Sequence, residues 1–209
     1  MNRTNNHEAL TTEQLILQAA EKEFMQKGYA GARTSSIAEA AGVTHAMMHY
    51  YFRTKDKLFN KIISDKMSLV REIMLGSLSD ENLPLFERLR VAIERHFDFI
   101  AANPDLPRFL IGEVFGQPGR MALILDQFKS CTPGVIASLQ QQINEYSRRG
   151  ECRRVDASML LLDIVSLNIF CFMAAPMINP LLDGLLSMHD FAERRKQENV
   201  MTIMRKLRP

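Results

Sequence analysis

Apolar side chains recur at three- and four-residue spacings along most of the chain, which is the pattern of amphipathic helices. The first such stretch opens at Thr11 and Thr12 and closes at Gly28, a residue suited to a left-handed helix cap. No alternating pattern of useful length predicts a strand, so we expect an all-α fold. Further stretches predict helices over 55–76, 84–102, 105–116, 119–130, 133–149, 155–175 and 189–207.

Residues 34–52 break this regularity, because two short helical patterns flank Gly42. The first covers Ser36–Ala41 and the second begins at His45 and ends near Tyr51. Small residues occupy the positions where the two helices would nearly touch. A helix, a tight glycine turn and a second helix are typical of a helix-turn-helix DNA reader. Hydroxyl side chains suited to N-caps precede both helices: Thr34, Ser35 and Ser36 for the first, and Thr44 for the second.

Composition and charge narrow the classes of protein that fit. The 209 residues are 46% hydrophobic and 24% charged, which indicates an ordered globular chain. Only 10 Gly and 8 Pro are present, few for a barrel or sandwich with many tight turns. The formal net charge is +2, so a nucleic-acid surface would have to be a local feature.

The three cysteines and the longest uncharged run bear on the cellular compartment. The cysteines form no CxxC pair, which argues against a disulfide framework or a zinc knuckle and favours reduced, cytoplasmic thiols. Residues 164–182 carry no formal charge and approach the length of a membrane span. Asn168, Pro176 and Pro180 lie within that run, so we expect a buried helix ending near Pro176 and no membrane association. The polar N-terminus shows no signal peptide.

Residues 34–59, TSSIAEAAGVTHAMMHYYFRTKDKLF, closely resemble the DNA-binding domain of the TetR family of bacterial transcription regulators. The polar residues 1–10 predict a flexible tail, and the resemblance implies a three-helix helix-turn-helix domain over 11–54. A C-terminal helical domain for ligand binding and dimerisation would cover 55–209. The shared features are Thr34, Ile37-Ala38, Ala41-Gly42-Val43-Thr44, Tyr50-Tyr51-Phe52 and Lys55-Asp56-Lys57-Leu58, and the match extends back through Gly28-Tyr29, Phe24 and Ala19-Ala20.

Two groups of residues are the candidates for contacting DNA. Amide groups at helix starts bind phosphate oxygens, and hydroxyls at the same starts can add donors or simply cap the helix. The resemblance implies that one tyrosine of the third helix packs in the core while Tyr51 donates to phosphate, and that Lys55 clamps a phosphate. The phosphate candidates are Thr34, Ser35, Thr44, Tyr50, Tyr51 and Lys55. The base-reading candidates, where the chain departs from the usual residues, are His45, Ala46, Met47 and His49.

The chemistry of those base-reading candidates leaves more than one interpretation open. Ala46 and Met47 suit contact with thymine methyl groups, and histidine can donate to guanine acceptors. Met48 more readily packs inward than outward. His45 and His49 are four residues apart on one helix, a spacing that can chelate a metal. No third ligand is close in sequence, so we expect no metal and no cofactor.

The region 62–185 is rich in Met and Phe, and most of these side chains are expected in the helix core. Flexible Met and flat Phe side chains can also line an apolar pocket, and the resemblance implies a small, often apolar effector there. The predicted helix at 155–175 is apolar almost all round and must be covered on two sides. The resemblance implies a homodimer through the last two helices. The candidate pocket residues are Met67, His96, Phe97, Phe109, Glu113, Phe128, Asp163 and Phe170.

Taken together, these features predict a homodimeric, cytoplasmic DNA-binding transcription regulator. Repression is the favoured mode, with a palindromic double-stranded operator released when a small, largely apolar ligand binds. An adaptor that uses the same fold mainly to bind protein is the alternative. A helical enzyme is disfavoured because no motif places an acid, a base or a nucleophile together.

Overall fold

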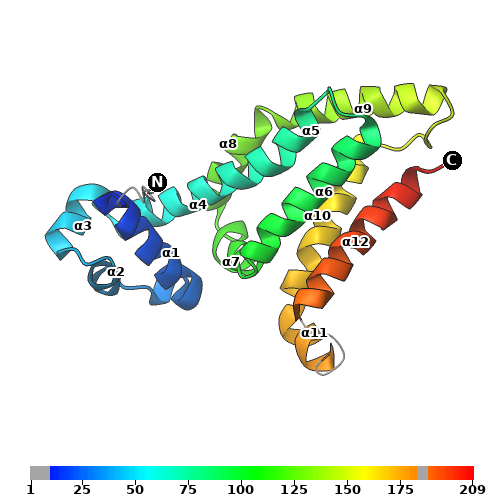
Figure 1. Cartoon of the computed structure of the whole chain (residues 1–209). Helices are drawn as coiled ribbons and strands as arrows, with labels where there is room; N and C mark the ends of the chain where they lie inside the picture. The colour runs from blue at the N-terminus through cyan, green and yellow to red at the C-terminus, as the bar shows by residue number, and fades with distance from the viewer. Residues whose placement is uncertain (1–9, 183–187) are drawn as a thin grey trace, which may run out of the picture. The chain divides into compact units, whose positions relative to one another are not determined.

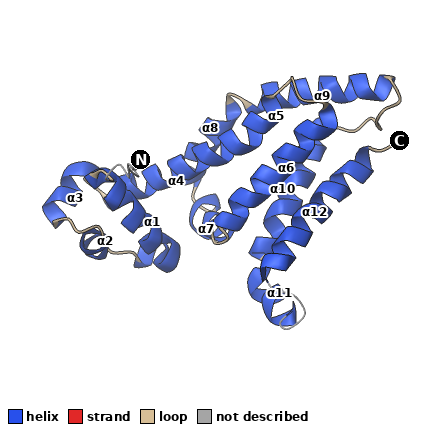
Figure 2. Cartoon of the chain, viewed as in Figure 1, coloured by secondary structure: helices blue, strands red, loops and turns tan. Residues whose placement is uncertain are grey.

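The computed structural model describes residues 10–182 and 188–209 of the chain. Every regular element among these residues is a helix, which confirms the predicted all-α fold (Figures 1 and 2). Most of the predicted tail, residues 1–9, lies outside the described residues. Contacts divide the chain into two compact units, Met1–Asp65 and Lys66–Pro209. The predicted domain boundary, between residues 54 and 55, lies within the first unit.

The first unit consists of three helices and the beginning of a fourth: α1 (Thr12–Gly31), α2 (Thr34–Ala40), α3 (His45–Phe52) and α4 (Lys55–Arg71). α1 begins with a capping box, as the sequence predicts. The Thr11 hydroxyl accepts a hydrogen bond from the Gln14 N–H at 3.3 Å, and Gln14 Oε1 accepts one from the Thr11 N–H at 2.8 Å. Near the other end of α1, Gly28 has φ 67°, so the chain leaves regular helical geometry there.

Aromatic packing forms the centre of the first unit. The Phe59 ring of α4 lies 5.0 Å, edge to face, from both Phe24 and Tyr29 of α1. Tyr29 also donates from its hydroxyl to Asp56 Oδ1 at 2.6 Å. These contacts join α1 to the start of α4, and the space between them is filled by apolar side chains. The buried residues are Ile16, Ala20, Phe24, Ala32, Ile37, Ala38, Ala41, Met48, Phe52, Leu58, Phe59, Ile62 and Ile63.

The second unit contains the rest of α4 and all later helices. η1 and η2 are single π-helical turns, and α4, η1 and α5 form one helical segment from residue 55 to residue 79. The sequence predicts this segment only to residue 76. The six later predicted helices agree with the structure to within two residues at each end. The sequence does not predict α11. The elements after α4 are η1 (Glu72–Gly76), α5 (Ser77–Ser79), α6 (Leu85–Ala102), α7 (Leu106–Leu110), η2 (Ile111–Phe115), α8 (Pro118–Lys129), α9 (Thr132–Arg148), α10 (Ala157–Met173), α11 (Ala175–Leu182) and α12 (Met188–Leu207).

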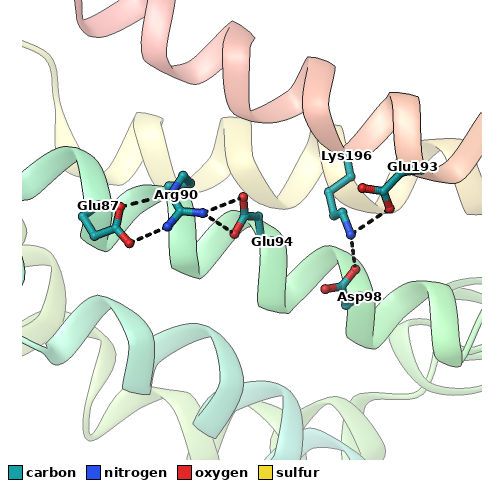
Figure 3. Close-up of polar contacts among 6 residues, drawn as sticks. All are labelled: Glu87, Arg90, Glu94, Asp98, Glu193 and Lys196. Atoms are coloured by element: carbon teal, nitrogen blue, oxygen red, sulfur yellow. Dashed lines mark hydrogen bonds and ion pairs between the residues drawn. The ribbon is translucent and has the colours of Figure 1, made fainter.

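Helices α6, α10 and α12 pack side by side, and α9 contacts both α6 and α10 (Figure 1). On the surface of this layer, Lys196 of α12 bridges Asp98 of α6 at 2.9 Å and Glu193 at 3.0 Å (Figure 3). The core between the helices includes Leu89, Ile93, Leu139, Ile143, Leu160, Ile164, Ile203 and Leu207. Among the described residues, no helix has the length and apolarity needed to cross a membrane.

A chain of buried polar side chains crosses this core. Asn168 of α10 donates through Nδ2 to the Ile93 carbonyl at 2.9 Å and to His96 Nδ1 of α6 at 3.2 Å. Its Oδ1 accepts from Asn199 Nδ2 of α12 at 2.9 Å. Burial lowers the pKa of His96 to about 4, so the ring is neutral near pH 7. The three helices are therefore linked by neutral hydrogen bonds.

Candidate DNA-binding site

The α3 helix turns one apolar face inward and presents the rest to solvent. Met48 and Phe52, four residues apart, are 3% and 8% exposed and anchor the helix to the core of the first unit. The inward position of Met48 confirms the expectation from the sequence. All six predicted DNA contacts on this helix are exposed: His45, Ala46, Met47, His49, Tyr50 and Tyr51.

The turn before α3 holds the helix in place. Gly42 has φ 68°, its N–H donates to the Glu39 carbonyl at 3.1 Å, and the Val43 N–H donates to the Ala38 carbonyl at 3.0 Å. This pair of bonds is a Schellman motif, and it closes α2 at the predicted glycine. The Thr44 hydroxyl then accepts from the Met47 N–H at 3.2 Å and caps α3, as predicted. Its own O–H stays available to donate to a phosphate.

The start of α2 differs from the prediction. The helix begins at Thr34, two residues earlier than expected, and Arg33 occupies the N-cap position without a side-chain cap. The Arg33 N–H instead donates to Glu23 Oε1 of α1 at 3.2 Å, which sets where α2 begins. Thr34, Ser35 and Ser36 are therefore not N-caps. Thr34 Oγ1 is hydrogen-bonded to His45 Nε2 at 3.3 Å, which joins the first turn of α2 to the first turn of α3.

The two histidines of α3 lie together on its surface. Their ring centroids are 4.7 Å apart, and His49 Nδ1 donates to the Arg53 carbonyl at 3.0 Å. Among the residues that the structure describes, no group of three or more His, Cys, Asp or Glu side chains is placed to hold a metal. Each of the two rings is hydrogen-bonded within the protein, His49 to the Arg53 carbonyl and His45 through Nε2 to the Thr34 hydroxyl.

Neither tyrosine of α3 packs in the core, so the expectation that one would do so is wrong. Tyr50 is 81% exposed and Tyr51 is 41% exposed, with their rings 5.5 Å apart. Phe52 takes the inward position instead, because it lies one helical turn after Met48. Both tyrosine hydroxyls remain at the surface that would face DNA.

Lys55 is already engaged within the protein. Its Nζ donates to the Ala32 carbonyl at 2.7 Å, lies 3.5 Å from the Ala30 carbonyl, and sits 4.7 Å from the centroid of the Tyr29 ring. These contacts hold the start of α4 against the end of α1. An ammonium group has three donors, so Lys55 can contact a phosphate only in addition to this structural role.

A shallow depression gathers several of the predicted residues. It is lined by Thr34 of α2, by His49 and Arg53 at the end of α3, and by Thr54 and Lys55 at the start of α4. The Thr54 hydroxyl accepts from the Lys57 N–H at 3.2 Å and caps α4. Arg53 has φ 39°, and the Thr54 N–H donates back to the Phe52 carbonyl, so the chain turns within three residues. Two further basic residues, Arg33 and Arg53, are exposed beside these helix ends. The sequence pattern did not assign them to DNA, although their positive charge could have indicated a phosphate contact.

The candidate effector residues do not gather around one cavity. Met67, His96, Phe97 and Phe109 are buried core residues, and Glu113 Oε2 lies 3.8 Å from Arg120. Asp163 pairs with Lys206 on the surface, and Phe170 is 65% exposed. Phe128 lines a mainly apolar cavity of about 690 Å³ between α8, α9 and the start of α10. Another cavity of about 540 Å³ lies between Ala101, Pro104 and Arg108 on one side and Phe172 and Phe191 on the other.

Two family models match most of this chain. The model for bacterial regulatory proteins of the tetR family matches residues 16–62, and the model for the tetracyclin repressor-like C-terminal domain matches residues 86–203. The second match alone covers more than half of the chain. The protein therefore belongs to the TetR family of bacterial transcriptional regulators, as the sequence of the first unit predicts.

Individual relatives and a solved structure agree with this assignment. The chain is 30% identical to the HTH-type transcriptional regulator YdgC of Bacillus subtilis over 118 residues, which cover 54% of this chain and 60% of YdgC. It is 27% identical to the HTH-type transcriptional repressor BepR of Brucella suis, over 71% of this chain and 72% of BepR. The fold matches that of FadR from Bacillus subtilis in complex with stearoyl-CoA, with a TM-score of 0.66 at 19% identity, covering 92% of this chain and 97% of the other.

Proposed function

We propose that this protein is a homodimeric repressor that acts in the cytoplasm, binds a palindromic operator and releases it when a small, largely apolar ligand binds the second unit. The observation that carries the proposal is the exposed surface of α3 on a rigidly anchored helix. Met48 and Phe52 hold the helix from inside, and the side chains facing solvent are those that suit base edges.

Contacts around α3 would divide into two kinds. Thr34, Thr44, Tyr51 and Lys55 surround the helix with hydroxyl and ammonium donors, which suit phosphate oxygens. Phosphate contacts set the position of the protein and most of its non-specific affinity. The base edges would be read by the exposed side chains of α3, the helix that follows the turn at Gly42. These side chains are His45, Ala46, Met47 and His49.

The dimer part of the proposal is supported by one face of α10. Met159, Leu162 and Phe170 are 55%, 56% and 65% exposed, and they follow one another at helical spacing on that face. An exposed apolar face of this kind suits a subunit interface. To read a palindrome, the two α3 helices of such a dimer would have to meet successive major grooves, about 34 Å apart.

The effector part of the proposal is supported by the cavities of the second unit. Cavities of about 690 and 540 Å³ are within the range of small-molecule sites, and both are lined mainly by apolar side chains. BepR is named as a repressor, and the structure of FadR holds stearoyl-CoA. A ligand would release DNA only as far as it binds the non-binding conformation more tightly than the binding one.

Selection of bound sequences from random DNA tests the proposal. We expect the wild-type protein to enrich a palindrome and His45→Ala to change the preference at one or two positions per half-site, by about 1–3 kcal/mol for each base that His45 reads. Affinity for random DNA should change much less, because phosphate contacts supply it. If both proteins enrich the same half-site with the same penalties, His45 reads no base. If no sequence is enriched, the adaptor alternative is favoured.

A further inference from the structure

The end of the second unit that contains the α9–α10 loop is densely basic. A cavity of about 390 Å³ at this end is lined by Asn144, Ser147 and Arg148 of α9 and by Arg154 of the loop. All four side chains carry hydrogen-bond donors, and none of them is acidic. Such a lining suits an anion with several oxygen atoms.

The two arginines of this cavity are not neutralised by carboxylates. Arg148 donates through Nε to the Asn144 carbonyl of its own helix at 3.4 Å, which leaves its two Nη groups for other partners. Among the described residues, neither Arg148 nor Arg154 forms an ion pair. By contrast, the Arg90 guanidinium forms ion pairs with both Glu87 and Glu94 on α6 (Figure 3).

The acidic residues near the cavity are engaged elsewhere. Glu151 pairs with Arg149 at 3.0 Å, and Glu145 Oε1 accepts from Gln141 at 3.1 Å. Asp156 accepts from Ser158 and Met159 at the start of α10. Hydrogen bonding to Ser158 and Met159 lowers the pKa of Asp156, so it remains a charged helix cap. Within the part of the chain that the structure describes, none of these three carboxylates forms an ion pair with Arg148 or Arg154.

The loop that carries Arg154 is held rigidly by backbone bonds. Gly150 has φ 73°, and the Glu151 N–H donates to the Tyr146 carbonyl at 2.9 Å. The Arg153 N–H donates to the Leu207 carbonyl at the end of α12 at 2.7 Å, which brings exposed Arg153 and Arg208 to the same end of the unit. A preformed arrangement of this kind loses little entropy when it binds a ligand.

From these features we infer that Arg148 and Arg154 bind the phosphate groups of a small phosphorylated molecule. Guanidinium groups bind phosphate through paired, charge-assisted hydrogen bonds, and Ser147 and Asn144 add neutral donors. Asn144 Oδ1 already accepts from Gln140 Nε2 at 3.1 Å, so its Nδ2 group is the part available to the ligand. No residue of this site belongs to the first unit, so phosphate binding here does not depend on the proposed repressor function.

The phosphorylated molecule could be a free nucleotide or one that carries an acyl chain. The apolar cavity of about 690 Å³ is lined by Pro133, Ile136, Ala137 and Gln140, which precede Asn144 on the same face of α9. Gln140 lies between Ile136 and Asn144, where it donates to Asn144 Oδ1 and to the Val155 carbonyl, both at 3.1 Å, and accepts from the Ala157 N–H at 2.8 Å. An apolar tail that runs from a phosphate group at Arg154 toward Ile136 would have to displace the Gln140 side chain.

Calorimetric titration of the full chain tests the inference, with coenzyme A and palmitoyl-CoA as separate probes. Both should bind the wild-type protein, and Arg148→Gln and Arg154→Gln should each weaken binding by about tenfold or more. Tighter binding of palmitoyl-CoA identifies an acylated ligand, whereas equal affinities identify a nucleotide. Arg90→Gln is the matched control, because it removes the same charge from a surface outside the cavity and should leave both affinities unchanged.

Several results would overturn the inference. One is wild-type affinity in both arginine variants, and another is equal weakening in Arg90→Gln, which would indicate only the general charge of the protein. A third is binding of a duplex without operator sequence that both variants weaken, with neither coenzyme A probe bound. Circular dichroism of each variant confirms that it is folded, and binding of the selected operator measures the repressor function separately.

Discussion

The hydrogen bond of His49 decides what this side chain can offer to a base. A carbonyl only accepts, so the His49 Nδ1 that bonds to Arg53 must carry the proton. In the neutral ring, Nε2 is then an acceptor, which matches the amino groups of cytosine or adenine. The sequence alone suggests donation to guanine, because a sequence cannot show which nitrogen carries the proton.

Lys55 should matter for stability as well as for DNA binding. Lys55→Ala removes the bonds to Ala30 and Ala32 and the contact with Tyr29, and we expect the free energy of unfolding to fall by about 1–3 kcal/mol. If Lys55 also binds phosphate, the slope of log affinity against log salt should become shallower by about 0.9 for each phosphate that is no longer neutralised. Urea unfolding and binding titrations at several salt concentrations measure the two effects.

Lys57→Ala provides the comparison for Lys55, because Lys57 is an exposed residue two positions later in the same basic stretch. We expect little change in the free energy of unfolding for this variant. If Lys55→Ala loses stability while the slope of log affinity against log salt is unchanged, Lys55 has a purely structural role. Unchanged stability would instead contradict the importance of the contacts with α1.

His96 should make the stability of the protein depend on pH in the acid range. Its pKa falls from 6.5 to about 4 on burial, so between these values the unfolded chain binds a proton that the folded protein does not. This contribution is fully present above pH 6.5 and is lost as the pH falls toward 4, in total about 3 kcal/mol. Urea unfolding at a series of pH values measures the loss.

The variant His96→Leu isolates this effect from the titration of carboxylates. Asn168 keeps its bond to the Ile93 carbonyl in this variant, so the buried amide retains one acceptor. The difference in unfolding free energy between wild type and variant should change by about 3 kcal/mol across the interval. A difference that stays constant from pH 4 to pH 6.5 would show that His96 is protonated in the folded state.

At the scale of elements, the turn between α2 and α3 depends on the backbone of one residue. Gly42 has φ 68°, and a Cβ added there would meet no atom within 4 Å, so the whole effect of a side chain is conformational. We expect Gly42→Ala to lower the free energy of unfolding by about 1–2 kcal/mol. Gly42→Asn should lower it less, because asparagine tolerates a left-handed conformation.

Replacing Gly134 with alanine should have the opposite effect on the free energy of unfolding. It lies inside α9, its added Cβ would also meet no atom within 4 Å, and its φ is not positive. Gly134→Ala should therefore raise the free energy of unfolding by about 0.5–1 kcal/mol through helix propensity. Equal effects of the two alanine substitutions in urea titrations would contradict a conformational role for Gly42.

Most helix boundaries could be predicted because caps and apolar spacing are local. Thr11, Gly42 and Thr44 act at the positions that the pattern assigns to them. The π-helical turns at 72–76 and 111–115 have no such local signal, because an extra residue in a turn leaves the three- and four-residue spacing nearly unchanged. The start of α2 depends on the bond from Arg33 to Glu23, ten residues away, which spacing cannot show.

The candidate DNA surface was easier to predict than the effector site for the same reason. Its residues lie on one short helix and the turns beside it, so their exposure follows from the anchors Met48 and Phe52. Pocket residues come from many helices, and an apolar residue on a nearly uniform helix can face the core, a cavity or solvent. Phe97 and Phe170 illustrate this, because one is 1% exposed and the other 65%.

At the scale of the whole molecule, the exposed stripe on α10 predicts how two chains assemble. Replacing Leu162, which is 56% exposed in one chain, with Asp would place a carboxylate in an apolar interface and should dissociate the dimer. Sedimentation at micromolar concentration should then give the mass of one chain instead of two. Operator affinity should fall with it, because each monomer engages only one half-site, while the fold of the single chain should persist.

Leu69→Asp is the control for this prediction, because Leu69 is also a partly exposed leucine, 42% exposed, but lies on α4. Both variants introduce the same carboxylate, so a general effect of added negative charge on DNA binding would appear in both. We expect Leu69→Asp to remain a dimer with nearly wild-type operator affinity. A dimeric Leu162→Asp variant would place the interface elsewhere than the face formed by Met159, Leu162 and Phe170. A wild-type protein that sediments as a single chain would contradict the dimer itself.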